Sequence, residues 1–115
     1  MLGTALEEYA SYLRERTSAP VEIDAGDLTL PGVLVSPENI TFEVLDGDRC
    51  TITVAVWIIG NGDATRHALN DIGNIGYDLR HETHEWQPTT LALSSQSADA
   101  LPALQGTVEI TYEKD

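Results

Sequence analysis

Apolar residues recur at helical spacing near the start of the chain and again in its second half. The first such segment runs from about Thr4 to Arg16, and the second from about Asp63 to Arg80. Both follow the i, i+3, i+4, i+7 spacing that places apolar side chains on one helix face. The first stripe is Leu6, Tyr9, Ala10 and Leu13, and the second is Leu69, Ile72, Gly76 and Leu79, with Ile75 beside it. We predict two amphipathic helices, capped by Thr4 and Asp63.

Between the helices the pattern changes to alternation, which is typical of half-buried strands. Residues 39–45 and 50–59 alternate on either side of the turn signal Asp46-Gly47, and this predicts a β-hairpin. The predicted apolar face comprises Ile40, Phe42, Val44, Ile52, Val54, Val56 and Ile58. The opposite face comprises Thr41, Glu43, Thr51 and Thr53.

The remaining segments predict shorter or later strands. Proline and glycine interrupt residues 18–37, so we expect loops there around short extended pieces at 21–23 and 33–35. Two last strands are expected at 89–93 and 107–113, with a polar loop at 94–105 between them. This order predicts a single α+β domain over residues 1–115, with two helices and a mostly antiparallel sheet.

The charge of the chain narrows the possible partners. Nineteen acidic residues oppose six basic ones among 115 residues, for a formal net charge of -13. Such a surface repels nucleic-acid backbones and anionic membranes, so we expect neither a DNA-gripping nor a membrane protein. The same charge suits a protein that lets DNA pass without holding it. Cys50 is the only cysteine, which excludes an intramolecular disulfide and a cysteine zinc cluster.

Two motifs suggest chemistry, and neither meets its requirements. Gly60 and Gly62 follow a strand and precede a helix, but Thr65 stands where a dinucleotide-binding motif has its third glycine. We therefore expect these glycines to form a turn with a positive φ angle. His81 and His84 are one residue closer than the spacing of a zinc-protease helix, and we interpret them as residues of a helix C-terminus. No nucleophile elbow is present and no carboxylate pair stands out, so we expect no enzyme activity, cofactor or metal.

The whole layout resembles the tail terminator, or tail completion, proteins of long-tailed bacteriophages. The features that carry the resemblance are the N-terminal helix "LGTALEEYASYLRE", the strand "TITVAVWII", the join and helix "GNGDATRHALNDI", and a final strand pair with a "LPAL" segment between. It is a resemblance of layout that covers most of the chain. The join departs from the proline-containing form of that family, which leaves neighbouring neck or head-closure proteins as alternatives.

The resemblance implies a non-enzymatic virion protein of the tail-neck region, assembled in the host cytoplasm. Family members form a ring, usually a hexamer, that stops growth of the tail tube and joins it to the head-closure proteins, with DNA passing through the lumen. Two other classes stay open on the residues themselves. One is a small enzyme that uses scattered carboxylates, and the other is a monomeric acidic adaptor that mimics DNA.

Three surfaces follow as hypotheses. The polar sheet face, with Glu43, Thr51, Thr53, Glu109 and Glu113, is expected to line the ring lumen. The apolar positions Leu45, Trp57 and Ile59 are expected to pack on a neighbouring subunit or on a helix of the same chain, with preference for the neighbour. The loop carrying Glu22, Asp24 and Asp27 is expected to gain its order mainly from a partner.

Overall fold

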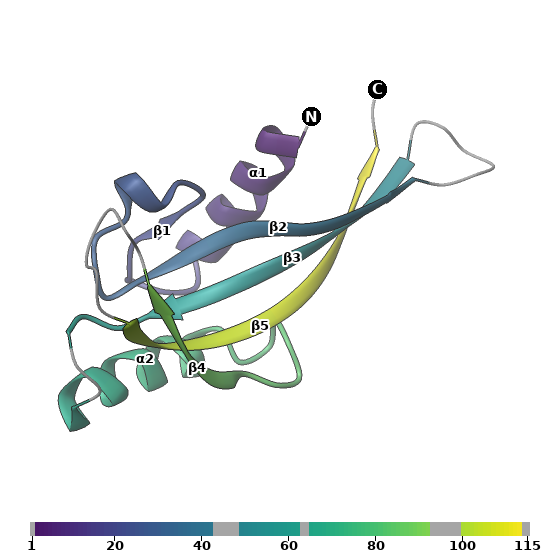
Figure 1. Cartoon of the computed structure of the whole chain (residues 1–115). Coiled ribbons are helices and arrows are strands. Elements are labelled where there is room, and N and C mark those ends of the chain that lie inside the picture. The colour runs from purple at the N-terminus through teal and green to yellow at the C-terminus, as the bar shows by residue number, and fades with distance from the viewer. Residues whose placement is uncertain (1, 43–48, 63–64, 93–99, 114–115) are drawn as a thin grey trace.

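The computed structural model describes residues 2–42, 49–62, 65–92 and 100–113. These form two α-helices, one short 3-10 helix and a five-stranded sheet (Figure 1). In chain order the elements are α1 (Leu2–Arg14), β1 (Val21–Glu22), η1 (Ala25–Asp27), β2 (Gly32–Phe42), β3 (Arg49–Ile59), α2 (Arg66–Asp78), β4 (Gln87–Ala92) and β5 (Ala100–Glu113). The expected α+β class is confirmed.

The sheet has the strand order β1-β2-β3-β5-β4, and only the β1–β2 pair is parallel. The predicted hairpin is present, since β2 and β3 pair antiparallel up to Phe42 and Cys50. Its turn signal lies outside the described residues. The strands β2, β3 and β5 continue past both helices, so the sheet ends in a three-stranded extension (Figure 1). We call residues 37–42, 49–54 and 108–113 of these strands the arm.

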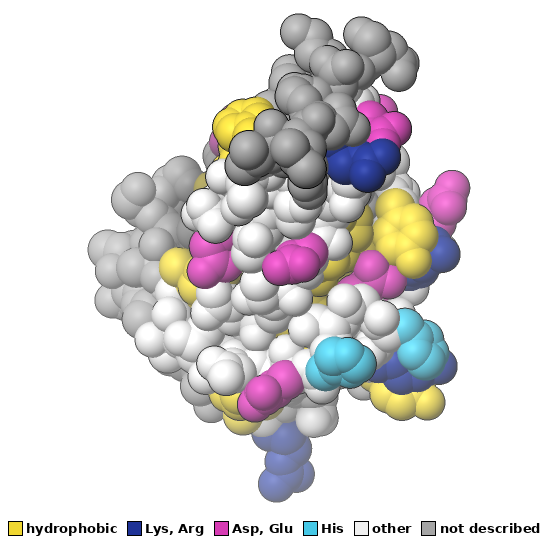
Figure 2. All heavy atoms as spheres, turned by 90° about the vertical axis from the view of Figure 1, so that its right-hand side faces the viewer, with side chains coloured by type: hydrophobic (Ala, Val, Ile, Leu, Met, Phe, Trp, Pro, Cys, Tyr) yellow, Lys and Arg dark blue, Asp and Glu magenta, His cyan; other side chains and the backbone are white. Residues whose placement is uncertain are grey.

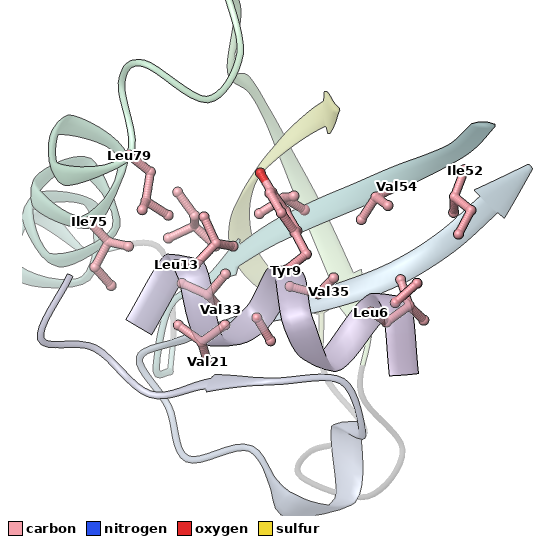
Figure 3. Packing of buried hydrophobic residues seen from close by; sticks show 14 of the residues in the cluster. Leu6, Tyr9, Leu13, Val21, Val33, Val35, Ile52, Val54, Ile75 and Leu79 are labelled. Carbon is pink, nitrogen blue, oxygen red and sulfur yellow. The ribbon is translucent and has the colours of Figure 1, made fainter. Parts of the chain in front are cut away.

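Both helices pack on the same face of the sheet and enclose the main core. The predicted stripe of α1 is buried in full, with Leu13 and Ala10 completely inaccessible. Figure 3 shows Leu6, Tyr9 and Leu13 pointing from α1 into the cluster to which the strands contribute Val35, Ile52 and Val54. The alternating positions of β3 are buried as predicted, and they are Ile52, Val54, Val56 and Ile58.

The helix ends differ from the predictions. α1 begins at Leu2, so Thr4 lies inside its first turn rather than at its cap. α2 begins at Arg66, and the side chain of Thr65 caps it by accepting a hydrogen bond from the backbone N–H of Ala68 at 3.2 Å. The predicted cap Asp63 lies outside the described residues. A hydroxyl at Thr65 satisfies an otherwise unpaired N–H of the first turn.

One position of the α2 stripe was predicted wrongly. Leu69 is 49% exposed, and Ala68 takes its place among the buried residues of the helix. Gly76 is packed closely, because a Cβ there would lie 3.3 Å from Leu104. Gly73 faces open space and is not needed for packing. The buried face of α2 is therefore shifted slightly from the predicted stripe toward Ala68. Gly76 still packs against the sheet as part of that face.

Two predicted loops are strands. The segment expected as a polar loop at 94–105 enters β5 from Ala100 onward, and β2 is continuous from Gly32 to Phe42 instead of two pieces. Proline and glycine favoured the loop interpretation of residues 18–37, and polar residues that of 94–105. A proline also lacks the N–H that a central strand needs. Pro102 is tolerated because β3 ends at Ile59, opposite Ala103, so that the residues of β5 before Ala103 have only β4 as a paired strand. Pro37 lies at an irregularity in the β2–β3 register.

Candidate functional site

The polar face of the sheet is the side opposite the two helices. In the arm, Thr51 of β3 lies between Thr41 and Thr111, and Thr53 lies beside Glu109. The side chains of Glu109 and Thr111 are exposed, and Thr51 and Thr53 are half-buried between their neighbours. The hypothesised channel residues of β3 and β5 therefore share one hydrated face. Glu43 lies outside the described residues.

A basic residue at the end of this face offsets part of its charge. Arg49 pairs with Glu113 across the β3–β5 ladder, and its Nε donates to Glu113 Oε1 at 2.7 Å. Arg49 therefore balances the charge of Glu113 on this face. Both side chains are about half exposed, and exposed ion pairs contribute about 0.2–1 kcal/mol. Glu109 has no ion pair within the described residues.

The same sheet face becomes apolar at its other end. A second cluster of buried residues there consists of Leu28, Ile59, Leu101 and Ala103, with Leu34, Trp57 and Leu91 packed against it. The loop that contains η1 supplies Leu28 and covers the cluster from within the chain. Ile59 is completely inaccessible, so it offers no surface to another subunit. The interface expectation is wrong for Ile59 and stays a prediction for the half-buried Trp57, and Leu45 lies outside the described residues.

Contacts within the chain also order the acidic loop. Val21 pairs with Val33, and the Asp24 carboxylate accepts a hydrogen bond from the Gly26 N–H at 2.9 Å. Glu22 lies 3.7 Å from Arg14, and Asp27 is exposed. The loop is therefore held from within the chain, and the expectation that a partner provides most of its order stays a prediction. The burial of Leu28 beneath the loop contributes to this hold, because an apolar anchor fixes the loop against the sheet.

The glycine join between β3 and α2 is a structural turn. Gly62 has φ 84°, a conformation that favours glycine, which confirms the expected positive-φ turn. Gly60 is closely packed, since a Cβ would lie 3.1 Å from Pro102 and 3.3 Å from Ile72. Its N–H donates to the Pro102 carbonyl at 2.8 Å, so it is not directed toward an anion. These two glycines thus have packing and turn roles.

The histidine segment lines a shallow hollow after α2. The hollow has a volume of about 610 Å³ and is lined by Arg80, His81, Glu82, Thr83, His84, Thr107, Val108 and Glu109. His81 and His84 are exposed. Within the described ranges, no group of three or more histidine, cysteine, aspartate or glutamate side chains could hold a metal ion. Of the two described helices, neither is long and apolar enough to cross a membrane.

A buried polar contact joins α1 to the segment after α2. Tyr9 donates its hydroxyl to Glu82 Oε1 at 2.9 Å, and the Arg16 guanidinium lies 4.0 Å from the other carboxylate oxygen. Burial is the main cause that raises the pKa of Tyr9 far above its ordinary value, and the hydrogen bond to Glu82 adds to it. Thr17 makes a second link by donating to Asp78 at 3.0 Å. Sequence reasoning assigned Tyr9 to the apolar stripe, and nothing local pointed to its partner 73 residues away.

Comparisons with known proteins add no relative. No family model, curated protein or solved structure matches this chain.

Proposed function

We propose that this protein is a structural subunit of a bacteriophage tail, of the tail terminator kind. Copies of the chain assemble into a ring, expected to be a hexamer, which ends the tail tube and joins it to the head-closure protein. DNA passes through the lumen without specific binding. The protein is a component of the virion in the tail-neck region, and assembly takes place in the host cytoplasm.

The observation that carries the proposal is the division of the sheet into two unlike faces. One face is covered by α1 and α2, and no described helix covers the opposite face in the arm. That open face presents hydroxyls and the carboxylate of Glu109. A wall of this kind stays hydrated and repels phosphates, and screening at physiological salt limits the repulsion to about 8 Å. A conduit for DNA needs such a surface, because transient passage requires that phosphates find no strong site.

The alternatives differ in what their surfaces require. A DNA mimic needs carboxylates in a regular array, but the described acidic side chains lie apart from one another on the face that Figure 2 shows. Glu113, one of the two glutamates described on the polar face of the arm, is paired with Arg49. A neck or head-closure protein fits the same two-faced sheet, so only its binding partner separates it from a terminator.

The direct test is assembly. Native mass spectrometry and light scattering should show a species of several times the 12.5 kDa chain mass, six times for a hexamer. Electron microscopy with purified tail tubes should show this ring at a tube end, where it stops further growth. A chain that stays monomeric with and without tubes would exclude the proposal. A ring that binds head-closure protein but no tube would assign it to the neck instead.

The channel assignment has its own test within an assembled ring. Glu109→Lys replaces an exposed carboxylate by a base, and we expect the ring to form but to retain double-stranded DNA in fluorescence anisotropy at low salt. Glu85→Lys makes the same charge change at another exposed residue and serves as the control. Equal DNA retention by the two variants would place Glu109 outside the lumen.

A further inference from the structure

Along the arm, two strand edges of the sheet have no described strand beside them, and residues 80–84 line a hollow next to residues 107–109 of β5. β4 covers the outer edge of β5 only up to Gln105, and no described strand lies beside residues 108–113. On the other side, β1 covers β2 only at Val33 and Leu34. No described strand therefore pairs with the outer edge of β2 from Val35 to Phe42, and the regular part of this edge begins after the irregularity at Pro37. Open edges carry backbone N–H and C=O groups that can pair with another strand.

Apolar rows cross the arm and end at both open edges. The strand register defines two rows, which run from β2 through β3 to β5 as Phe42–Cys50–Tyr112 and Ile40–Ile52–Ile110. Their central members are buried, but Phe42 is 61% exposed, and Ile110 and Tyr112 are only partly covered. A strand added at either edge, with its apolar side chains on the same face of the sheet, would lengthen these rows and cover their exposed ends.

The charged side chains on the polar side of the sheet differ between the β5 edge and the β2 edge. If the β5 edges of two copies paired with each other, Glu109 and Glu113 would be brought near their own equivalents, and like charges on paired strands are destabilising. Among its described residues β2 offers the uncharged Asn39 and Thr41 on this side, while Glu38 lies at the irregularity and Glu43 lies outside the described residues. Pairing β2 of one copy with β5 of the next therefore places the uncharged Asn39 and Thr41, rather than a second glutamate, beside Glu109 and Thr111.

We propose that a second copy of this chain is the partner of these edges, with its β2 added to β5 of the first along the arm. The contact continues the sheet from subunit to subunit, places Ile40 and Phe42 beside Ile110 and Tyr112, and extends the Thr and Glu face as one surface. It joins unlike surfaces head to tail, and such contacts close into rings when the rotation allows. The inference rests on the proposed ring and names the edges that build it.

Cysteine crosslinking tests the pairing directly. Within one chain, β3 separates Thr41 from Thr111, so their Cα atoms are two strand spacings apart, about 9.6 Å. A disulfide needs Cα atoms about 4.4–6.8 Å apart, so thiols at these positions can join only between copies. Thr41→Cys and Thr111→Cys are made separately, with tags of different size, in a Cys50→Ala background that removes the native thiol.

The expected result is a mixed dimer on non-reducing gels when the two variants are combined and oxidised, and much less product from either variant alone. The double variant should give a ladder of covalent oligomers. If light scattering shows a ring but the mixed crosslink is absent, the edge pairing is wrong while the ring proposal stands. If the chain is monomeric throughout, both are wrong. If a crosslink forms only with added tail tube protein, that protein is the partner of the β2 or β5 edge, and the pairing between copies is wrong.

Discussion

The buried hydrogen bond between Tyr9 and Glu82 should contribute measurably to the free energy of unfolding. Tyr9→Phe removes only the hydroxyl that donates to Glu82 Oε1 at 2.9 Å. The Tyr9 residue and the Glu82 side chain are each only 9% exposed, so water cannot readily replace the lost donor. A hydrogen bond to a charged group contributes about 1.5–3 kcal/mol. Arg16, at 4.0 Å from the other oxygen, still offsets part of the carboxylate charge, so we expect a loss of roughly 1.5 kcal/mol.

The assay is urea unfolding followed by circular dichroism at one fixed protein concentration, because assembly would otherwise change the apparent stability. Tyr12→Phe is the matched control, since Tyr12 stacks on Tyr9 at 5.9 Å but is 40% exposed and its hydroxyl has no hydrogen bond within the described part of the chain. We expect that control to stay within about 0.5 kcal/mol of the parent protein. A double-mutant cycle with Glu82→Gln then isolates the coupling. Equal losses for the two phenylalanine variants would refute the reasoning.

Three further predictions follow from burial, backbone angle and ionisation. Gly62→Ala should cost about 1–2 kcal/mol because φ is 84°, whereas Gly73→Ala, which faces open space in α2, should stabilise by up to about 1 kcal/mol in the same unfolding assay. Ile59→Ala should lower the free energy of unfolding by about 2–5 kcal/mol because the side chain is inaccessible. Phe42 is 61% exposed, so Phe42→Ala should leave monomer stability nearly unchanged and weaken assembly in light scattering. The pKa of Tyr9 is raised in the folded protein, so its contribution to the free energy of unfolding is fully present below the ordinary value of 10.0 and is lost as the pH rises above it. The free energy of unfolding should therefore fall less steeply above that pH in Tyr9→Phe than in the parent protein.

The sequence by itself determined the features that depend on neighbours along the chain. The apolar stripe of α1 and the alternation in β3 follow from periods of 3.6 and 2 residues, and each is visible within a few turns or a single strand. The same alternation separated the Thr and Glu face from the apolar one, and the positive φ of Gly62 followed from its place between two elements. These predictions succeeded because the physical cause lies within the segment itself.

The tertiary structure decided what covers each surface. Ile59 and Trp57 face away from the helices and pack in one cluster with Leu28 of a distant loop and with Leu91 and Leu101, so local pattern alone made them resemble a subunit contact. Residues 94–105 were expected to form a polar loop, but β5 begins at Ala100. Pro102 lies beyond the end of β3, where a missing N–H breaks no pairing with β3.

The partner of Tyr9 lies 73 residues away in the sequence, and no periodicity encodes such a contact. Chain segments that meet only after folding share no local signal. For that reason the sequence predicted the faces of the sheet, and the fold alone showed which face the helices cover and which edges have no described strand beside them.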